Sequence, residues 1–358
     1  MTATAPQLSE VPAQILGVRT ATPPTSYSQH DILDLFQVDD PRIRSLFLNS
    51  AIERRFLTLP MRENGAPHLE SQGDLLQKHR EIAIDIGASA VEACLAEAGY
   101  SIGDIRHLCC VTSTGFLTPG VSALLLRRLD ARRDCVRLDI VGMGCNAGLN
   151  GLSAVAGWAN SNPGQLAVLL CVEVCSAAYV FDGSIQTAVV NSLFGDGAAA
   201  AAIVSGIDHV PTSPVLRKFA SCIVPEAADA MRFSWDESHN KFSFFLDRDV
   251  PYLVGAHAEQ VIDQLLKGTG VRRSQIAHWL VHSGGKKVID AVKVNLGLTA
   301  DDLRHTSGVL RDYGNLSSGS FLFSYERLRA EDRAQPGDYG VMMTMGPGLT
   351  IEMALVQW

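Results

Sequence analysis

The sequence predicts an α/β fold on three observations. Strand-like and helix-like segments alternate along the chain. Several strand-like runs, including residues 165–174 and 198–206, are almost entirely apolar, which is typical of strands buried on both faces. A strand followed by a glycine-containing turn, small residues and a helix occurs at 142–159 and again at 312–329. This repetition indicates an internal duplication, with a joint near residues 205–214.

The bulk composition limits the classes of function. The 358 residues suffice for one large domain or two ordinary ones, and 47% hydrophobic with 19% charged residues fits a compact soluble protein. A net charge of −8 without any Lys/Arg-rich block argues against nucleic acid and against a broad anionic membrane surface as partners. No apolar stretch approaches the roughly 18–20 residues of a membrane span, and the N-terminus shows no secretory signal.

The eight cysteines predict a reducing compartment. Most of them lie within apolar runs, which suits free thiols better than a disulfide framework. Cys171 and Cys175 have neither a second cysteine pair nor a histidine nearby, so we expect no zinc site. These observations predict a cytoplasmic protein without a bound metal.

The elements follow one another in a regular order. Residues 13–23 predict a strand, residues 39–56 a helix with several arginines, and residues 77–98 a long amphipathic helix. Further helices are expected at 254–266, at 286–296 and after residue 312. The remaining predicted strands are 107–114, 135–142, 165–174, 198–206, 214–224, 241–249, 277–283, 339–346 and 350–358.

Cys145 is the first candidate catalytic residue. It lies between Gly144 and Ala147 in a turn of small residues that permits close backbone approach, just where a helix is expected to begin. Free N–H groups and the positive end of the helix dipole would favour the nucleophilic thiolate there and could hold an oxyanion. A cysteine simply packed among glycines is an equally good interpretation of the local sequence.

His282 is the candidate partner of a thiolate. It ends an apolar strand and opens into a Ser-Gly-Gly turn, and α/β proteins present ligand-facing groups at such strand ends. A histidine merely hydrogen-bonded at a strand end is the competing interpretation. His278, beside Trp279, suggests packing. Most other histidines are predicted to lie on the surface, among them His30, His68, His79 and His239.

Asn315 supplies a third polar group at a similar strand-to-helix turn. Its amide can donate hydrogen bonds to a developing enolate or oxyanion, although a helix cap is the commoner use of such an asparagine. Asp196, in a glycine turn, is expected to be a turn or cap residue. Cysteine, histidine and asparagine at three separate turns together predict a catalytic site more strongly than any one alone.

Five segments in order give the chain a family resemblance. GMGCNAG, LFGDGAAA, VHSGGKKVID, YGNLSSGSFLFS and MGPGLTIEMAL resemble the signature segments of the type III polyketide synthases, the chalcone synthase-like family. The resemblance implies a thiolase fold with a duplicated five-layered αβαβα architecture. It also implies an N-terminal half over residues 1–210, which carries the cysteine, and a C-terminal half over 211–358, which carries the histidine and asparagine.

The resemblance assigns a role to each candidate. Cys145 would carry the acyl group, while His282 and Asn315 would stabilise the enolate that forms when malonyl-CoA loses carbon dioxide. No metal or redox cofactor is implied. Tyr179 and Phe244 fall at the family's two gatekeeper positions between CoA tunnel and cavity, Ser317 is expected to line the cavity, and Thr118 lies near the dimer-interface position. Arg42 matches a basic CoA-phosphate position, and Arg44, Lys286 and Lys287 are expected to replace the others. Solvated surface charges are an equally good interpretation of these cations. Tyr179 departs from the family's phenylalanine. Its hydroxyl could bind a polyketide oxygen or a water, and an ordinary packed aromatic is the competing interpretation.

The resemblance also implies a reaction. CCVTSTGFLTPG, FLNSAIERRFLTLP and FSFFLDRDVPY are similar to bacterial members of glycopeptide-antibiotic pathways, which join four malonyl-CoA units into 3,5-dihydroxyphenylacetyl-CoA. A homodimer is expected, and accessory pathway enzymes are candidate partners. The alternatives are a tetrahydroxynaphthalene or alkylresorcinol product, a β-ketoacyl carrier-protein synthase III, and a non-catalytic scaffold, for which a complete Cys-His-Asn set has no use.

Overall fold

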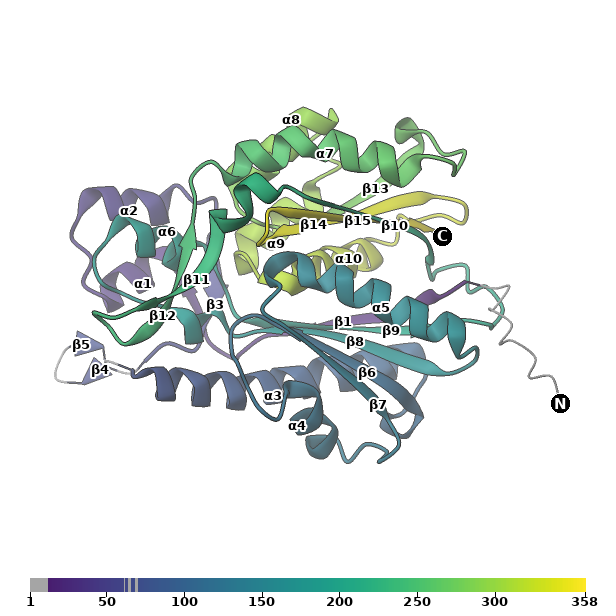
Figure 1. Cartoon of the computed structure of the whole chain (residues 1–358), viewed down its shortest axis with the longest axis horizontal. Helices are drawn as coiled ribbons and strands as arrows, with labels where there is room; N and C mark the ends of the chain where they lie inside the picture. The colour runs from purple at the N-terminus through teal and green to yellow at the C-terminus, as the bar shows by residue number, and fades with distance from the viewer. Residues whose placement is uncertain (1–11, 61, 64–65, 68–69) are drawn as a thin grey trace.

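Five layers make up the structure, a computed structural model that describes residues 12–60, 62–63, 66–67 and 70–358. Two half-sheets enclose a middle layer formed by helices α5 (Ala147–Ser161) and α10 (Ser320–Glu331) (Figure 1). The outer faces are covered on one side by α7 (Val250–Leu266) and α8 (Lys286–Leu296), and on the other by α3 (Gln72–Ala98) and α4 (Val121–Arg128). The predicted duplicated, five-layered α/β architecture is therefore confirmed.

The two half-sheets repeat one strand order. In the N-terminal half the order is β1-β9-β8-β6-β7, and in the C-terminal half it is β10-β15-β14-β13. Each begins with two antiparallel pairs and continues with a parallel pair. The half-sheets meet where β1 and β10 pair at Gln14 and Val215. The strands are β1 Gln14–Ala21, β6 Ile105–Thr112, β7 Val136–Val141, β8 Leu166–Glu173, β9 Gly197–Val204, β10 Val215–Ile223, β13 Ile276–Val281, β14 Tyr339–Gly346 and β15 Thr350–Gln357.

The alanine-rich strand β9 shows why the layers pack closely. All eight of its residues are buried, and α3 packs on one of its faces while α5 packs on the other. Small side chains allow helices to approach a strand from both sides without leaving cavities. The predicted joint at residue 210 falls in the connection between β9 and β10, and separate domains 1–210 and 211–358 stay a prediction.

A smaller group of elements lies beside the layers (Figure 1). It contains β2 (Ser26–Ser28), α1 (Gln29–Leu35), α2 (Pro41–Leu48), β3 (Arg54–Phe56), β4 (Arg62–Glu63), β5 (Ala66–Pro67), α6 (Ile185–Leu193), β11 (Met231–Asp236) and β12 (Lys241–Leu246). Helix α9 (Arg304–Tyr313) precedes α10. No helix in the described part of the chain is long and apolar enough to cross a membrane.

Two predicted helices differ from the observed ones. The helix expected over residues 39–56 is wrong in its second half, because α2 ends at Leu48 and the chain turns into β3, which pairs with β2. The long helix begins earlier than expected, at Gln72. Its start is fixed by Ser71, whose hydroxyl accepts a hydrogen bond from the Asp74 backbone N–H while the Asp74 carboxylate accepts one from the Ser71 N–H.

We predict that Gly148→Ala destabilises the protein and that Gly157→Ala in the same helix does not. A Cβ at position 148 would lie 2.2 Å from the Ser318 carbonyl oxygen and 2.6 Å from the Phe321 ring, whereas one at 157 meets no atom within 4 Å. The first change should cost about 1–3 kcal/mol through overpacking between α5 and α10. The second should add about 0.5–1 kcal/mol of helix stability.

Urea unfolding followed by circular dichroism measures both changes. Equal midpoints for the two variants would contradict the close contact between the middle helices.

Candidate active site

Cys145 lies in a short turn that other segments close tightly. The turn, η2 (Gly144–Asn146), connects β7 to α5, and the Cys145 side chain is buried. The Gly144 N–H donates to the Ser113 hydroxyl at 2.7 Å. A Cβ on Gly144 would lie 2.3 Å from Pro347 Cδ, and one on Gly346 would lie 3.0 Å from the Cys145 nitrogen. Only glycines at these positions allow the β14–β15 turn to pack against the cysteine.

Asn315 is held in one orientation by its neighbours. Its backbone N–H donates to the Leu193 carbonyl, and its Oδ1 accepts a 2.8 Å hydrogen bond from the Ser317 N–H. Its Nδ2 is 3.4 Å from the carbonyl oxygen of Gly284, two residues after His282. Because an NH₂ group has two hydrogens, Nδ2 retains a donor for a substrate oxygen.

His282 follows the last residue of β13, as the sequence predicts. Its backbone N–H donates to the Met343 carbonyl at 2.8 Å, and its ring is buried, with no hydrogen-bond partner for Nδ1 among the described residues. Gly284 connects two of the candidates, since its N–H donates to the His282 carbonyl and its own carbonyl lies 3.4 Å from Asn315 Nδ2. Ser317, whose N–H donates to Asn315 Oδ1, lines the same cavity as Cys145.

Burial controls the protonation of both titratable groups. It raises the pKa of the Cys145 thiol to about 12, although a hydrogen bond with Ser317 acts in the opposite direction. It also lowers the pKa of His282 to about 3. The thiol is therefore protonated at neutral pH, and the expected effect of the helix start on the thiolate stays a prediction. A buried thiolate here needs an adjacent cation, which proton transfer to His282 would provide.

A cavity of about 310 Å³ reaches Cys145. Cys145, Tyr179, Phe244 and Ser317 all line it, so the structure brings these four predicted residues together. His282 and Asn315 are buried beside this group rather than in the cavity wall. The other lining residues are Ser113, Thr114, Phe116, Gly142, Gly144, Cys175, Ala178, Val190, Phe194, Met231, Arg232, Phe233 and Pro347.

The Tyr179 hydroxyl is hydrogen-bonded to other groups of the protein. It accepts a hydrogen bond from Arg55 Nη1 at 2.8 Å and donates one to the Phe194 carbonyl. Its single O–H donor is used by the Phe194 carbonyl, so the hydroxyl cannot also donate to a polyketide oxygen, and the expected contact with a water stays a prediction. Arg55 was not a candidate in the sequence analysis, and it is fully buried.

The aromatic pair in the cavity wall also differs from the expected one. Phe244 packs edge to face against Phe194, with ring centroids 5.9 Å apart, whereas Tyr179 packs against Phe181. The sequence analysis missed Phe194. The available signal was its position in the LFGDGAAA segment, directly before the Gly-Asp-Gly turn.

The residues expected to contact CoA phosphates lie outside the cavity. Arg42 is exposed and bonds Asp40 at 2.8 Å, and Lys286 bonds Asp290 at 2.6 Å. Arg44 donates to the Val38 carbonyl. Lys287 is exposed at the start of α8. Exposed ion pairs of this kind are weak, so phosphate groups can compete for these cations.

The structure also shows where three further residues of the sequence analysis lie. Thr118 is exposed, in the loop between β6 and α4. Asp196 is buried and accepts hydrogen bonds from Thr58 and Ser176, which agrees with its expected role in a turn, and burial raises its pKa to about 6. His79, expected on the surface, is instead buried against Gly115, because it shares the inward face of α3 with Leu75.

The other predictions for histidine and cysteine stand as follows. His30 and His239 are exposed, whereas His68 lies outside the described residues. His278 is buried and its Nε2 lies 2.9 Å from Asp338. All eight cysteines are free thiols, as the sequence predicts.

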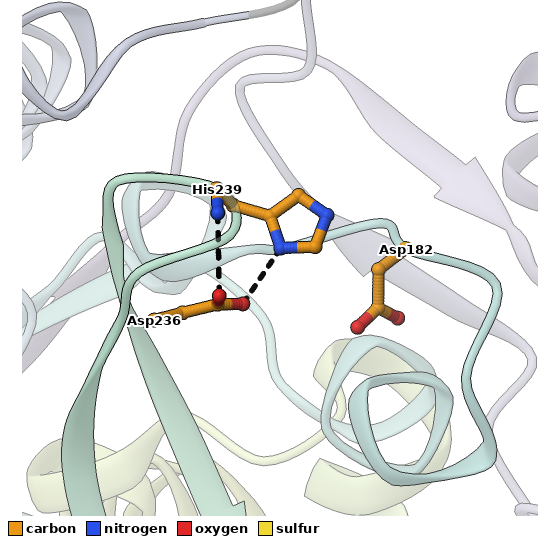
Figure 2. A group of neighbouring side chains, drawn as sticks. All are labelled: Asp182, Asp236 and His239. Atoms are coloured by element: carbon orange, nitrogen blue, oxygen red, sulfur yellow. Dashed lines mark hydrogen bonds and ion pairs between the residues drawn. The ribbon is translucent and has the colours of Figure 1, made fainter.

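A polar cluster lies at the tip of the β11–β12 hairpin. Figure 2 shows His239 bonded to Asp236, with Asp182 facing them from the segment before α6. Their potential ligand atoms lie within 4.8 Å of one another. Asp182 also accepts hydrogen bonds from Ser184 and Thr187, so local contacts account for much of this cluster.

Several known proteins are similar to this chain in sequence or in structure. A 3,5-dihydroxyphenylacetyl-CoA synthase from Amycolatopsis orientalis is 64% identical over 352 residues, covering 98% of this chain and 95% of that protein. A 1,3,6,8-tetrahydroxynaphthalene synthase from Streptomyces peucetius subsp. caesius is 30% identical, covering 96% and 93%. The crystal structure of PKS-I from the brown alga Ectocarpus siliculosus aligns with a TM-score of 0.88 at 26% identity, covering 97% of this chain and 98% of that one.

These similarities agree with the fold. The chain has the thiolase fold of type III polyketide synthases, as its resemblance implied. Residues 2–208 match the N-terminal domain of chalcone and stilbene synthases, and residues 216–358 match the C-terminal domain. The chain therefore belongs to the chalcone and stilbene synthase family.

Proposed function

We propose that this chain is a type III polyketide synthase that joins four malonyl-CoA units and cyclises the product to 3,5-dihydroxyphenylacetyl-CoA. This thioester is a precursor of dihydroxyphenylglycine in glycopeptide antibiotic biosynthesis. The observation that carries the proposal is the 64% identity, over 98% of the chain, to a protein with this named activity. The 30% identity to a tetrahydroxynaphthalene synthase makes that product the weaker candidate.

The geometry supports acyl transfer to Cys145. His282 takes the thiol proton, the sulfur attacks the thioester carbonyl, and the CoA thiolate leaves with that proton. Transfer within the pair keeps the buried site neutral overall, which matters because burial disfavours both separated charges. The acyl group then enters a cavity of about 310 Å³, at the small end of ligand sites. This size favours a short chain over a long acyl starter.

Asn315 is suited to stabilise the enolate. When malonyl-CoA loses CO₂, the electrons of the broken C–C bond pass to the remaining thioester. The thioester becomes an enolate, whose oxygen carries the negative charge. The Ser317 N–H bond to Asn315 Oδ1 directs the amide so that Nδ2 is the donor, and His282 supplies the second donor. The enolate carbon attacks the Cys145-bound carbonyl, a C–C bond forms, and the C–S bond breaks.

A homodimer is part of the proposal. β7 is the edge strand of the N-terminal half-sheet, and its Val136 and Leu138 side chains are 50% and 37% exposed. Exposed apolar edge strands are usually covered by another chain. Thr118 is exposed in the loop after β6, which pairs with β7, so a partner on this edge would lie near it. Accessory pathway enzymes stay possible partners by resemblance alone.

We predict that the purified protein converts malonyl-CoA alone into 3,5-dihydroxyphenylacetyl-CoA, identified by mass spectrometry. Cys145→Ala should abolish product formation, because it removes the thiol that is proposed to carry the growing chain as a thioester. A naphthalene product, or a strict need for a long acyl starter or a carrier protein, would replace the proposed reaction by one of the alternatives. Product formation by Cys145→Ala would overturn the assignment of the nucleophile.

We predict that His282→Ala makes Cys145 a poor nucleophile with a steep pH dependence. Without the imidazole as proton acceptor, the thiol keeps a pKa raised by burial to about 12. Below this pKa the thiolate fraction rises about tenfold per pH unit. The rate of iodoacetamide alkylation at Cys145 should therefore rise about tenfold per unit from pH 6 to 9 in the variant, and much less in the wild type.

Mass spectrometry of the Cys145 peptide measures this rate. Equal pH slopes in the two proteins would show that His282 does not pair with the thiol.

We predict that Leu138→Asp weakens the dimer, because a carboxylate would be buried at the β7 edge without a partner. Val294→Asp is the matched control, since Val294 is 78% exposed on α8. Light scattering coupled to size exclusion should show the wild type and Val294→Asp at twice the chain mass and Leu138→Asp largely at the chain mass. A wild type that runs as a monomer at the assay concentration refutes the proposed dimer.

A further inference from the structure

Arg55 is a buried cation with an unusual set of partners. It lies on β3 and has no exposed surface. Its Nη1 donates to the Tyr179 hydroxyl at 2.8 Å and to the carbonyls of Asn191 and Phe194 at 2.7 Å each, and its Nη2 donates to Gln29 Oε1 at 2.7 Å. All four acceptors are formally neutral.

These bonds tie Arg55 to the segment that holds Asn315. The Leu193 carbonyl accepts from the Asn315 N–H, and the Gly195 N–H donates to the Asn315 carbonyl, both at 2.9 Å. The residue between them, Phe194, gives its carbonyl to Arg55. The guanidinium therefore fixes the middle of the backbone segment that pairs with Asn315 on both sides.

The aliphatic part of Arg55 contacts the same region from another direction. A Cβ on Gly314, directly before Asn315, would lie 2.8 Å from Arg55 Cδ and 2.6 Å from the Leu193 carbonyl oxygen. Gly314 has φ +74°, which glycine adopts readily. Arg55 thus packs against Gly314, directly before Asn315, and donates to the carbonyl of Phe194, which pairs with Asn315.

Arg55 also fixes two side chains of the cavity wall. Tyr179 lines the cavity, and its hydroxyl bonds both Arg55 and the Phe194 carbonyl. Phe194 lines the cavity as well and packs edge to face on Phe244. One guanidinium therefore connects the backbone beside Asn315 with the aromatic wall near Cys145.

The chemistry of the group favours a positioning role. Burying an arginine side chain costs free energy, so its position has to be supported by its surroundings. Asp196 holds the residues that follow Arg55, because its N–H donates to the Phe56 carbonyl and its carboxylate accepts from the Thr58 N–H. Asp196 also supplies nearby negative charge. A rigid fork can bond several acceptors in fixed directions, whereas a lysine offers one flexible ammonium. A merely space-filling role would not need this fork.

We propose that Arg55 is a positioning residue that holds Asn315 in place for the decarboxylation step, acting through the Phe194 backbone, with Tyr179 as its second anchor in the cavity wall. The proposal rests on the proposed function and adds to it a residue outside the Cys-His-Asn set. It assigns Arg55 to the step that Asn315 serves and not to the acylation of Cys145.

The test separates those two steps in Arg55→Lys. Acylation is measured as the mass of acyl-Cys145 after brief exposure to malonyl-CoA, and decarboxylation as CO₂ release at saturating malonyl-CoA. We expect acylation within about threefold of the wild type and CO₂ release reduced about 100-fold with little change in KM, as for a displaced oxyanion donor. Arg54→Lys is the matched control, since Arg54 is exposed and should change neither rate.

A double variant distinguishes positioning from general damage. If Arg55 acts through Asn315, adding Arg55→Lys to Asn315→Ala should reduce CO₂ release by less than about threefold further. An equal loss in both backgrounds, or an equal loss of acylation, overturns the proposal. Asn315→Ala with wild-type CO₂ release would instead refute the role of Asn315 in the proposed function, whatever Arg55 does.

Tyr179→Phe keeps the proposal testable if Arg55→Lys does not fold. It removes only the hydroxyl between Arg55 and Phe194, so CO₂ release should fall about 3–10-fold, again without a further loss in the Asn315→Ala background. Unchanged CO₂ release in a folded Tyr179→Phe variant, with Arg55→Lys unfolded, overturns the proposal.

Discussion

The buried Glu173 carboxylate, which has no hydrogen-bonded cation among the described residues, holds the two turns of the candidate site together. It lies at the end of β8 and accepts hydrogen bonds from the Ser113 N–H at 2.9 Å and from the Ser317 and Ser318 hydroxyls at 3.1 and 2.6 Å. Ser113 in turn accepts from the Gly144 N–H beside Cys145. One carboxylate thus connects the cysteine turn of the N-terminal half with the asparagine turn of the C-terminal half.

Close packing of small residues makes this connection possible. Gly144 lies against Pro347 and Gly148 lies against the Ser318 carbonyl, at distances that a Cβ would not allow. The middle helices α5 and α10 therefore begin almost in contact, each preceded by a short turn that carries polar groups (Figure 1). The duplication brings equivalent turns of the two halves to one place, so the site lies where the halves meet.

The sequence predicted those parts of the site that depend on local pattern. Cys145, His282 and Asn315 each follow a strand or precede a helix, and strand ends and glycine turns leave a signal in neighbouring residues. The alternation of strands and helices likewise predicted the α/β fold and most elements. Residues 39–56 were misassigned because short β3 depends on pairing with β2, which local periodicity does not encode.

Residues that act through distant partners left no such signal. Arg55 and Tyr179 are 124 positions apart, and an arginine in a polar, arginine-rich segment is usually exposed. Tyr179 was placed in the cavity wall, but the direction of its hydroxyl depends on Arg55 and on the Phe194 carbonyl. His79 was misjudged for a local reason, since the predicted helix began at residue 77 and left out Leu75, which lies on the same buried face of α3.

The distribution of charge explains why the site needs both kinds of residue. Cys145 and His282 are both buried where separated charges are costly, so in the proposed reaction their ionisation is paired. The enolate of the proposed reaction is a new charge that such a pair does not fully neutralise, and its oxygen needs donors that are already in position. Asn315 can be such a donor only if its backbone does not move. The Glu173 hydroxyl network fixes one side of that turn and the Arg55 fork fixes the other.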